Sequence, residues 1–335
     1  MLSTVMAVFT IICLVSYINL MGESMKTKIG IVGYGNLGKQ VERQVIESRD
    51  CKLVAIFSRR EDAKSQFGSK IEKYENYINY INKIDIMLMC GSSQKDLQWQ
   101  SPQMLEHFDI IDTFDIHSKI NTHKTNLENV SKKSGKTAIY SCGWDPGLFS
   151  IIRVLNNAML KNPKVYTFWG KGVSQGHSVA LRQVEGVEDA IEYTIPNAEQ
   201  IQKARTDYNF ELINNTMHTR ECFVAVKQGY QKQDIEQKIL NTENYFKGQN
   251  VKIHFVKKQL IEKLKKRMYH AGQILGMGKD KNAQMRFYVK MKSNPQFTAN
   301  IMIAYINALQ NLPAGVYSVL DVAPKYLLKN SQELL

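Results

Sequence analysis

The glycine-rich segment at residues 33–38 constrains the fold of this 335-residue chain more than any other feature. It reads Gly33-Tyr-Gly-Asn-Leu-Gly38 and follows an apolar run that suits a strand buried on both faces. Apolar side chains then recur at helical spacing, at Leu37, Val41 and Val45. Glycines between a strand and a helix allow a tight turn, a close backbone approach to a pyrophosphate and close helix–strand packing. This context predicts a dinucleotide-binding unit rather than a purely structural turn.

The end of the next predicted strand, at residues 52–57, indicates which dinucleotide binds. An NAD-specific site places Asp or Glu there to bind the ribose hydroxyls. This chain has Ser58-Arg59-Arg60 instead. Two guanidinium groups and a hydroxyl suit a 2′-phosphate, because arginine presents its donors in a planar fork. The sequence therefore predicts NADP rather than NAD, with a solvated basic turn as the alternative.

Three further apolar runs, at residues 84–90, 110–113 and 137–141, alternate with helical patterns. This alternation predicts an α/β, Rossmann-type doubly wound parallel sheet, which binds ligands beyond the carboxyl ends of its strands. Asp115 and Asp145 follow two of these strands, so we expect them where the nicotinamide lies. Either could instead serve only as a helix cap.

The pattern of hydrophobic residues changes after residue 150. From there on, helical patterns separate strand-like runs at 165–169, 190–194, 222–226 and 251–256. These predict an α+β domain with a mostly antiparallel sheet and helices on one face. Helices at 298–312 and 317–322 close the chain. The predicted organisation is an apolar leader outside the fold (1–24), an NADP-binding domain (25–148), a substrate-binding and dimerisation domain (149–292) and a segment returning to the NADP-binding domain (293–335).

The leader and the net charge each raise an alternative. The leader has no basic flank and a poor cleavage site, which favours a wrongly assigned start codon over a signal or anchor. The chain carries 44 basic and 31 acidic residues, but no nucleic-acid motif. Its densest basic run, residues 257–267, suits a solvated helix face or loop. Five scattered cysteines indicate reduced thiols and no metal site. We therefore expect a cytoplasmic protein without nucleic-acid or stable membrane partners.

Five sequence motifs narrow the choice among two-domain dehydrogenases. In chain order they are Ile31-Val-Gly-Tyr-Gly-Asn-Leu-Gly38, Ile56-Phe-Ser-Arg-Arg60, Gly143-Trp-Asp-Pro-Gly147, Thr167-Phe-Trp-Gly170 and Ser174-Gln-Gly-His177. Together they resemble the meso-diaminopimelate dehydrogenase family over residues 27–330. The resemblance implies a homodimeric enzyme of lysine and diaminopimelate metabolism. Its reaction would be the reversible, NADP-dependent oxidative deamination of the D-centre of meso-2,6-diaminopimelate to L-2-amino-6-oxopimelate and ammonia.

The resemblance also implies roles for individual residues. Asp115 and Asp145 are the expected catalytic residues. The sequence does not assign the proton transfer to one or the other. The residues expected to bind the cofactor are Gly33, Tyr34, Gly35, Asn36, Leu37, Gly38, Ser58, Arg59, Arg60, Cys90, Gly91, Ser92, Ser93, Thr113, Phe114, Asp115, Cys142, Gly143, Trp144, Asp145 and Pro146. The residues expected to bind the D-amino acid end of the substrate are Asp115, Trp144, Asp145, Trp169, Gln175 and Gly176. The residues expected to bind its distal L-amino acid end are Thr194, Arg220, His270 and Asn294.

The chemistry of diaminopimelate agrees with these roles. Its two ammonium groups call for carboxylates such as Asp115 and Asp145, and its far carboxylate calls for an arginine fork such as Arg220. Without the resemblance, Arg220 could be a surface ion pair, His270 a loop histidine and the tryptophans core residues. The other functions that the sequence leaves open are an imine reductase like dihydrodipicolinate reductase, a non-catalytic NADPH sensor and a basic nucleic-acid binder.

Overall fold

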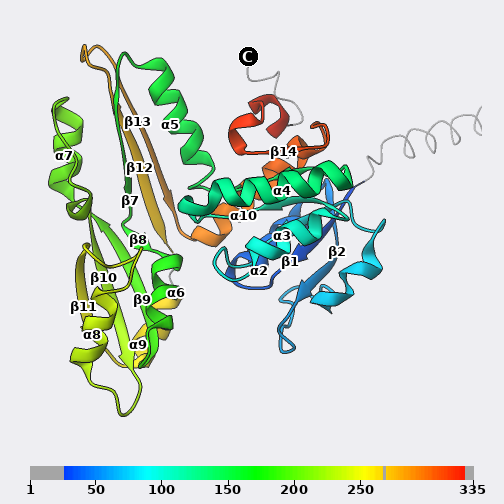
Figure 1. The fold of residues 1–335 in the computed structure, drawn as a ribbon, viewed down its shortest axis with the longest axis horizontal. Helices are drawn as coiled ribbons and strands as arrows, with labels where there is room; N and C mark the ends of the chain where they lie inside the picture. The colour runs from blue at the N-terminus through cyan, green and yellow to red at the C-terminus, as the bar shows by residue number, and fades with distance from the viewer. Residues whose placement is uncertain (1–25, 267–268, 329–335) are drawn as a thin grey trace, which may run out of the picture. The chain divides into compact units, whose positions relative to one another are not determined.

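The computed structural model describes residues 26–266 and 269–328, so the predicted leader at 1–24 lies outside the described residues. The chain divides into two compact units (Figure 1). Unit 1 contains the chain up to Pro146 and from Thr298 onward, and unit 2 contains Gly147–Phe297. The chain therefore leaves unit 1, builds unit 2 and returns.

Unit 1 is built on a seven-stranded sheet whose pairings are all parallel, which confirms the predicted doubly wound sheet. The strand order is β14-β6-β5-β4-β1-β2-β3. The chain thus runs outward from β1 in one direction and then restarts beside β1 with β4, which is the Rossmann order. The strands are β1 (Thr27–Val32), β2 (Cys51–Ser58), β3 (Ile71–Lys73), β4 (Ile86–Met89), β5 (Asp109–Asp112), β6 (Ala138–Ile139) and β14 (Val316–Tyr317).

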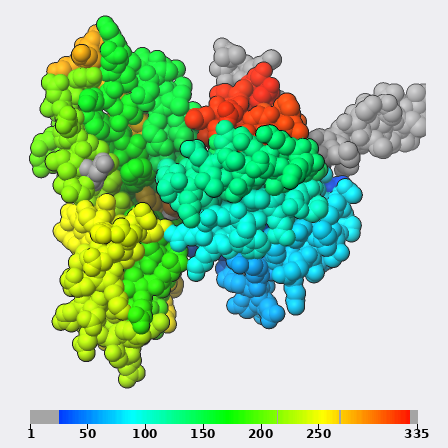
Figure 2. Space-filling view, in the orientation of Figure 1, coloured from blue at the N-terminus to red at the C-terminus, as the bar shows by residue number. Residues whose placement is uncertain are grey.

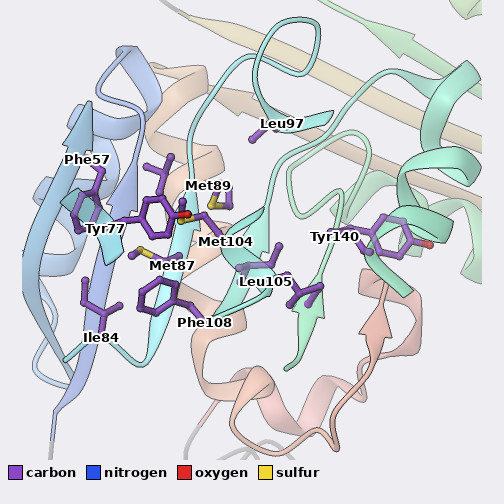
Figure 3. Packing of buried hydrophobic residues seen from close by; sticks show 14 of the residues in the cluster. Phe57, Tyr77, Ile84, Met87, Met89, Leu97, Met104, Leu105, Phe108 and Tyr140 are labelled. Carbon is purple, nitrogen blue, oxygen red and sulfur yellow. The ribbon is translucent and has the colours of Figure 1, made fainter. Parts of the chain in front are cut away.

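Helices close the faces of this sheet because its strands are apolar on both sides. The helices of this part of the chain are α2 (Asn36–Glu47), α3 (Leu97–Leu105), α4 (Ile120–Ser134) and α10 (Asn294–Leu309). Met87 of β4 packs with Met104, Leu105 and Phe108 from α3 and the turn after it (Figure 3). Helix α3 packs against β4, β5 and α4. The cyan and teal atoms of α3 and α4 form part of the surface in Figure 2.

The predicted helix at residues 317–322 is wrong. Tyr317 belongs to β14, which extends the parallel sheet beside β6, and only a 3-10 turn at Val319–Asp321 follows. Ser318 stops the strand, because its side chain accepts a hydrogen bond from the Leu320 amide at 3.2 Å and bonds Asp321 at 2.7 Å. Local capping and the free edge of the sheet thus override the helical spacing.

Unit 2 contains two sheets, and their pairings are antiparallel except that of β10 with β11. The predicted, mostly antiparallel character is confirmed. The four-stranded sheet contains β11 (Asn250–Phe255), β10 (His218–Val226), β9 (Val187–Pro196) and β8 (Gly172–Val173), in that order. The three-stranded sheet contains β13 (Gln284–Met291), β12 (His270–Met277) and β7 (Lys164–Trp169), in that order.

Helices cover both faces of the four-stranded sheet, so the expectation of helices on one face is wrong. Ala190 of β9 shares a core with α6 (Gln175–Gln183) and α8 (Lys232–Leu240). Its neighbour Ile191 points the other way and shares a core with Ile261 of α9 (Lys258–Lys265). The strand is therefore apolar at successive positions, and the alternation expected of a half-exposed sheet is weak. The remaining helices of unit 2 are α5 (Leu148–Met159) and α7 (Ala198–Thr206).

The predicted basic run forms much of α9. Its apolar face buries Ile261, while Lys258 pairs with Glu188 at 2.9 Å and Lys265 with Asp189 at 2.5 Å. Within the described residues, no helix combines the length and the apolar character needed to cross a bilayer.

Candidate active site

The strand order of unit 1 reverses between β1 and β4, and loops at such a switch point form ligand sites. Gly33 follows β1 with a φ of +93°, and a Cβ there would lie 3.0 Å from the backbone of Cys90 and Gly91. A Cβ at Gly38 would lie 2.1 Å from the Gly33 carbonyl oxygen, so a side chain cannot fit. A Cβ at Gly35, which precedes α2, would meet nothing within 4 Å. The open space at the helix start fits a pyrophosphate.

The predicted 2′-phosphate residues lie at the end of β2, next to this loop. Ser58 is buried, and its hydroxyl accepts a hydrogen bond from the Arg60 amide at 3.1 Å. The Arg60 guanidinium donates to the Tyr34 carbonyl oxygen, which ties it to the glycine loop. Arg59 is exposed, pairs with Asp96 and lies over the Trp99 ring, with 5.6 Å from Cζ to the ring centroid. The Arg60 guanidinium is thus held at the glycine loop and that of Arg59 at the start of α3, each by a polar contact that a phosphate could replace.

A buried glutamate that the sequence did not reveal joins these two loops. Glu42 lies on the inner face of α2, is 0% exposed and accepts hydrogen bonds from the hydroxyls of Tyr34 and Ser65. The Tyr34 hydroxyl also accepts from the Gln66 amide at 3.0 Å. Burial, and then the Glu42 carboxylate, raise the pKa of Tyr34. The only sequence signal for this cluster was an acid directly after the apolar-face residue Val41.

The loops after β4 and β5 carry the residues expected near the nicotinamide. The Asp115 amide donates to the Ser93 hydroxyl at 3.1 Å, which joins the two loops. Asp115 keeps contact with solvent, yet the protein atoms packed around its carboxyl raise its pKa, and a hydrogen bond from Ser93 opposes this rise. Burial raises the pKa of the Cys90 thiol, so this group stays neutral. Gly91, Ser92 and Thr113 lie in the same two loops.

A second buried pair supports the loops after β5 and β6. Asp112 ends β5, and its Oδ1 accepts from the amides of Phe114 at 3.1 Å and Ser141 at 3.0 Å. Its Oδ2 lies 2.6 Å from Nε2 of His123 on α4, and both side chains are buried. The His123 ring stacks on Phe114 at 4.1 Å between centroids. Neither member of this pair was predicted, because nothing local links residues on a strand and on a later helix.

The Gly143-Trp-Asp-Pro-Gly147 motif forms the turn that follows β6. The Cys142 amide donates to the Asp112 carbonyl oxygen at 2.7 Å, and the Gly143 amide donates to the Pro146 carbonyl oxygen at 3.1 Å. Trp144 is buried and Asp145 half-buried, and the peptide bond between Asp145 and Pro146 is cis. Asp115 and Asp145 therefore lie on neighbouring loops that share the Asp112 side chain and backbone as anchors.

In unit 2, the predicted distal residues Thr194 and Arg220 are directly opposed on β9 and β10. The Arg220 guanidinium donates from Nη1 to the Thr194 hydroxyl at 2.8 Å. The same hydroxyl donates to Glu192, whose oxygens lie at 3.0 and 3.2 Å. Arg220 is 13% exposed at its side chain, so it is not the surface ion pair that the sequence left open. Glu192 was missed, although an acid in the apolar run 190–194 was a signal.

Histidines surround this arginine. His270, the first residue of β12, is buried, which excludes a loop position. His218 Nε2 accepts a hydrogen bond from the Trp169 amide at 2.9 Å, and the two rings lie 5.5 Å apart. Burial, together with the positive charge of Arg220, lowers the pKa of His218 to about 3 and that of His270 to about 4. Neither histidine therefore adds a positive charge beside Arg220 near neutral pH.

The other predicted substrate residues lie on adjoining elements. Gln175 and Gly176 form the first turn of α6, which begins where the Ser174 amide donates to the Glu192 carbonyl oxygen at 3.1 Å. A Cβ at Gly172 of β8 would lie 2.4 Å from the His270 Cα, so β8 and the start of β12 are in contact. Asn294 begins α10, an element that belongs to neither sheet of unit 2. The structure thus groups the distal residues around β8, β9 and β10, except Asn294.

Comparisons with known proteins agree with this geometry. Residues 143–293 match the model of the diaminopimelic acid dehydrogenase C-terminal domain. The meso-diaminopimelate D-dehydrogenase of Acetivibrio thermocellus is 39% identical over 322 residues, which cover 92% of this chain and 96% of the relative. The solved structure of the C. glutamicum DAP dehydrogenase in complex with DAP has a TM-score of 0.87 and 33% identity, and the match covers 92% of this chain and 98% of the other.

An engineered D-amino acid dehydrogenase bound to NADP⁺ is also similar, with a TM-score of 0.85, 31% identity and coverage of 92% of this chain and 98% of the other. The match to the Acetivibrio thermocellus enzyme covers 92% of the chain and therefore extends over both units. These findings confirm the resemblance: the chain belongs to the meso-diaminopimelate D-dehydrogenase family.

Proposed function

We propose that this chain catalyses the reversible, NADP-dependent oxidative deamination of the D-centre of meso-2,6-diaminopimelate, releasing L-2-amino-6-oxopimelate and ammonia. As a member of its family the chain is an amino-acid dehydrogenase. The observation that carries the substrate assignment is Arg220, a buried guanidinium that keeps one hydrogen-bond donor, Nε, without a partner among the described residues. Such a fork is suited to a carboxylate, which the far end of diaminopimelate supplies.

The nucleotide loops of unit 1 fit the cofactor. The open backbone at Gly35 and the start of α2 would hold the pyrophosphate, and Ser58, Arg59 and Arg60 would hold the 2′-phosphate. NADP supplies the hydride acceptor when it is bound. The lack of an acid at the end of β2 supports NADP over NAD.

The two aspartates of unit 1 would serve the reacting D-centre. The ammonium group must lose a proton so that its nitrogen can donate electrons as hydride leaves Cα, and water must then add to the carbon. Asp115 and Asp145 can bind the ammonium group, accept its proton or orient the water. The raised pKa of Asp115 supports a role in proton transfer, because it brings the carboxyl closer to the pH at which the enzyme works.

We further propose that the protein works as a cytoplasmic homodimer. Unit 2 exposes large apolar side chains on α5 and β13, where Met159 is 66% and Tyr288 51% exposed, and a second copy could cover them. A cytoplasmic location fits an enzyme that draws on the intracellular NADPH pool. Light scattering after gel filtration would test the dimer.

The decisive test measures NADP⁺ reduction on meso-diaminopimelate beside the L,L isomer and a short D-amino acid. We expect activity with the meso isomer and none with the L,L isomer, which lacks a D-centre. Arg220→Ala should raise the Michaelis constant for meso-diaminopimelate at least tenfold, or about 1.4 kcal/mol, because a charge-assisted pair is lost. Turnover on the short D-amino acid, which has no distal carboxylate, should change about twofold or less. Equal loss on both substrates would make Arg220 a structural residue.

A further inference from the structure

Glu192 and Arg220 lie across the β9–β10 pair, but one hydroxyl stands between their charged groups. Arg220 Nη1 is 3.8 Å from Glu192 Oε1, which is longer than a hydrogen bond. The Thr194 hydroxyl fills the gap, accepting from Arg220 at 2.8 Å and donating to the carboxylate at 3.0 Å. The carboxylate therefore orients the guanidinium without occupying it.

The edge of Arg220 that faces away from Thr194 carries a donor without a partner among the described residues. Nη1 is bound to Thr194, whereas Nε is buried and has no hydrogen-bond partner among the described residues. Nε and Nη2 form the side edge of the guanidinium, the two-donor edge that pairs with a carboxylate. A buried charged donor without an acceptor costs free energy, so this geometry is expected where a ligand completes the pairing.

The histidines around Arg220 do not change their charge near neutral pH. Burial, followed by the charge of Arg220, lowers the pKa of His177 on α6 to about 3. The pKa values of His218 on β10 and His270 on β12 are lowered to about 3 and 4, with burial as the largest cause. All three imidazoles are therefore neutral in the range where the enzyme would work.

Glu192 differs from these neighbours. Burial raises its pKa to about 7, although the charge of Arg220 acts in the opposite direction. The other groups that face this region keep one charge state: burial raises the pKa of the Cys222 thiol, and the Arg182 guanidinium is engaged by the Ala190 carbonyl oxygen at 2.8 Å. Within the described residues around Arg220, Glu192 is therefore the group whose charge changes near neutral pH.

We propose that Glu192 is a positioning residue for the distal carboxylate, which sets the orientation and effective charge of Arg220 through Thr194 and takes up a proton when that carboxylate binds. The inference rests on the proposed function, in which Arg220 holds the far carboxylate. Two ionised carboxylates beside one guanidinium repel each other, so binding favours the protonated form of Glu192. Above the pH at which Glu192 ionises in the free protein, substrate binding is then coupled to proton uptake.

The test compares the parent with Glu192→Gln, in which the side chain is permanently neutral but keeps an oxygen that accepts from Thr194. The dissociation constant of meso-diaminopimelate for the enzyme–NADPH complex, in which no turnover can occur, is measured by calorimetry from about pH 6 to 9. The affinity of the parent for meso-diaminopimelate should fall about threefold to tenfold as the pH rises across this range. The reason is that a difference of one unit between the Glu192 pKa values of the free and bound states changes the affinity tenfold. Glu192→Gln should show no such trend. The matched control is Glu221→Gln, which changes an acid on the neighbouring strand β10 whose carboxylate lies 3.2 Å from the His254 ring.

Calorimetry in two buffers of different ionisation enthalpy measures the proton directly. The parent should take up about 0.3–0.5 proton per substrate near pH 7.5, as a pKa rise of about 0.5–1 unit from the value of about 7 requires, and Glu192→Gln none. Thr194→Val, which removes the bridging hydroxyl, should weaken the binding of meso-diaminopimelate about tenfold.

The outcomes distinguish a failure of this inference from a failure of the proposed function. Absence of proton uptake by the parent would overturn the inference even if Glu192→Gln fails to fold. Retention of the parent's pH trend in Glu192→Gln would overturn it as well. If Arg220→Ala weakens meso-diaminopimelate while neither Glu192→Gln nor Thr194→Val has its expected effect, only the inference fails. If Arg220→Ala leaves the affinity unchanged, the proposed distal anchor itself fails.

Discussion

The Asp112 carboxylate lies 2.6 Å from Nε2 of His123 in the interior of unit 1, where the two residues are 0% and 2% exposed. The other oxygen of the same carboxylate accepts hydrogen bonds from the backbone amides of Phe114 and Ser141. One buried group thereby supports the loop that carries Asp115 and the turn that leads to Asp145. We therefore expect the geometry of the reacting end to depend on a residue that touches neither substrate nor cofactor.

Replacing Asp112 should destabilise unit 1 strongly. Asp112→Ala leaves two buried amides and an imidazole without their acceptor, so the free energy of unfolding should fall by about 3–5 kcal/mol. Asp112→Asn keeps one acceptor oxygen and should cost about 1–3 kcal/mol. Urea denaturation measures both, with Glu128→Gln on α4, a half-exposed acid, as a control that should change stability by about 0.5 kcal/mol or less. An unchanged urea midpoint for Asp112→Ala would contradict the supporting role.

The arginine pair after β2 should determine the choice of cofactor. Arg59→Ala and Arg60→Ala each remove a charged donor from the expected 2′-phosphate site, so each should raise the Michaelis constant for NADP⁺ about 10- to 100-fold. The value for NAD⁺, which lacks this phosphate, should change about twofold or less. Arg49→Ala, an exposed arginine beyond the far end of α2, is the matched control. Equal use of NAD⁺ and NADP⁺ by the parent enzyme would refute the assignment.

The Ser93 hydroxyl should tune the acid limb of the pH–rate profile. Packing around the Asp115 carboxyl raises its pKa, and the hydrogen bond from Ser93 lowers it by favouring the ionised form. Ser93→Ala removes the lowering contribution, so the pKa should rise further. If the reaction needs ionised Asp115, the acid limb of kcat/KM should move to higher pH by about 0.5–1 unit. Asp115→Asn should abolish this limb, and a limb unaffected by either change would remove Asp115 from proton transfer.

The buried Glu192 should make stability depend on pH. Its folded-state pKa of about 7 lies above the ordinary value of 4.5, so the folded protein binds this proton more tightly than the unfolded chain. The stabilising contribution is complete below the ordinary pKa and is lost as pH rises through about 7. Glu192→Gln mimics the protonated form at every pH. The free energy of unfolding of Glu192→Gln relative to that of the parent should therefore rise by about 1–3 kcal/mol from pH 5 to pH 8.5. Urea denaturation at both pH values measures this gain, which Glu221→Gln should not show.

Several features of the fold and site follow from short stretches of sequence. The glycines at 33, 35 and 38 act within one turn between a strand and a helix, and Ser58-Arg59-Arg60 ends the next strand. Their structural consequences depend on neighbouring residues, so the motif and its hydrophobic context predict them. The doubly wound sheet follows in the same way, because a strand buried on both faces must be covered by helices.

Other features depend on contacts between distant parts of the chain. The helices on both faces of the second sheet, the extra strand β14 and the buried acids Glu42, Asp112 and Glu192 had no decisive local signal. A carboxylate can be buried only where partners from other elements satisfy it, as Tyr34 and Ser65 do for Glu42 and Thr194 does for Glu192.

The sequence by itself therefore determined the nucleotide-binding fold, the preference for NADP and the residues that follow β1 and β2, because these depend on local backbone conformation and on hydrophobic periodicity. Tertiary structure alone decided which buried acids face Arg220 and His123, because hydrogen bonding and desolvation in the interior are set by strands and helices that meet only after folding.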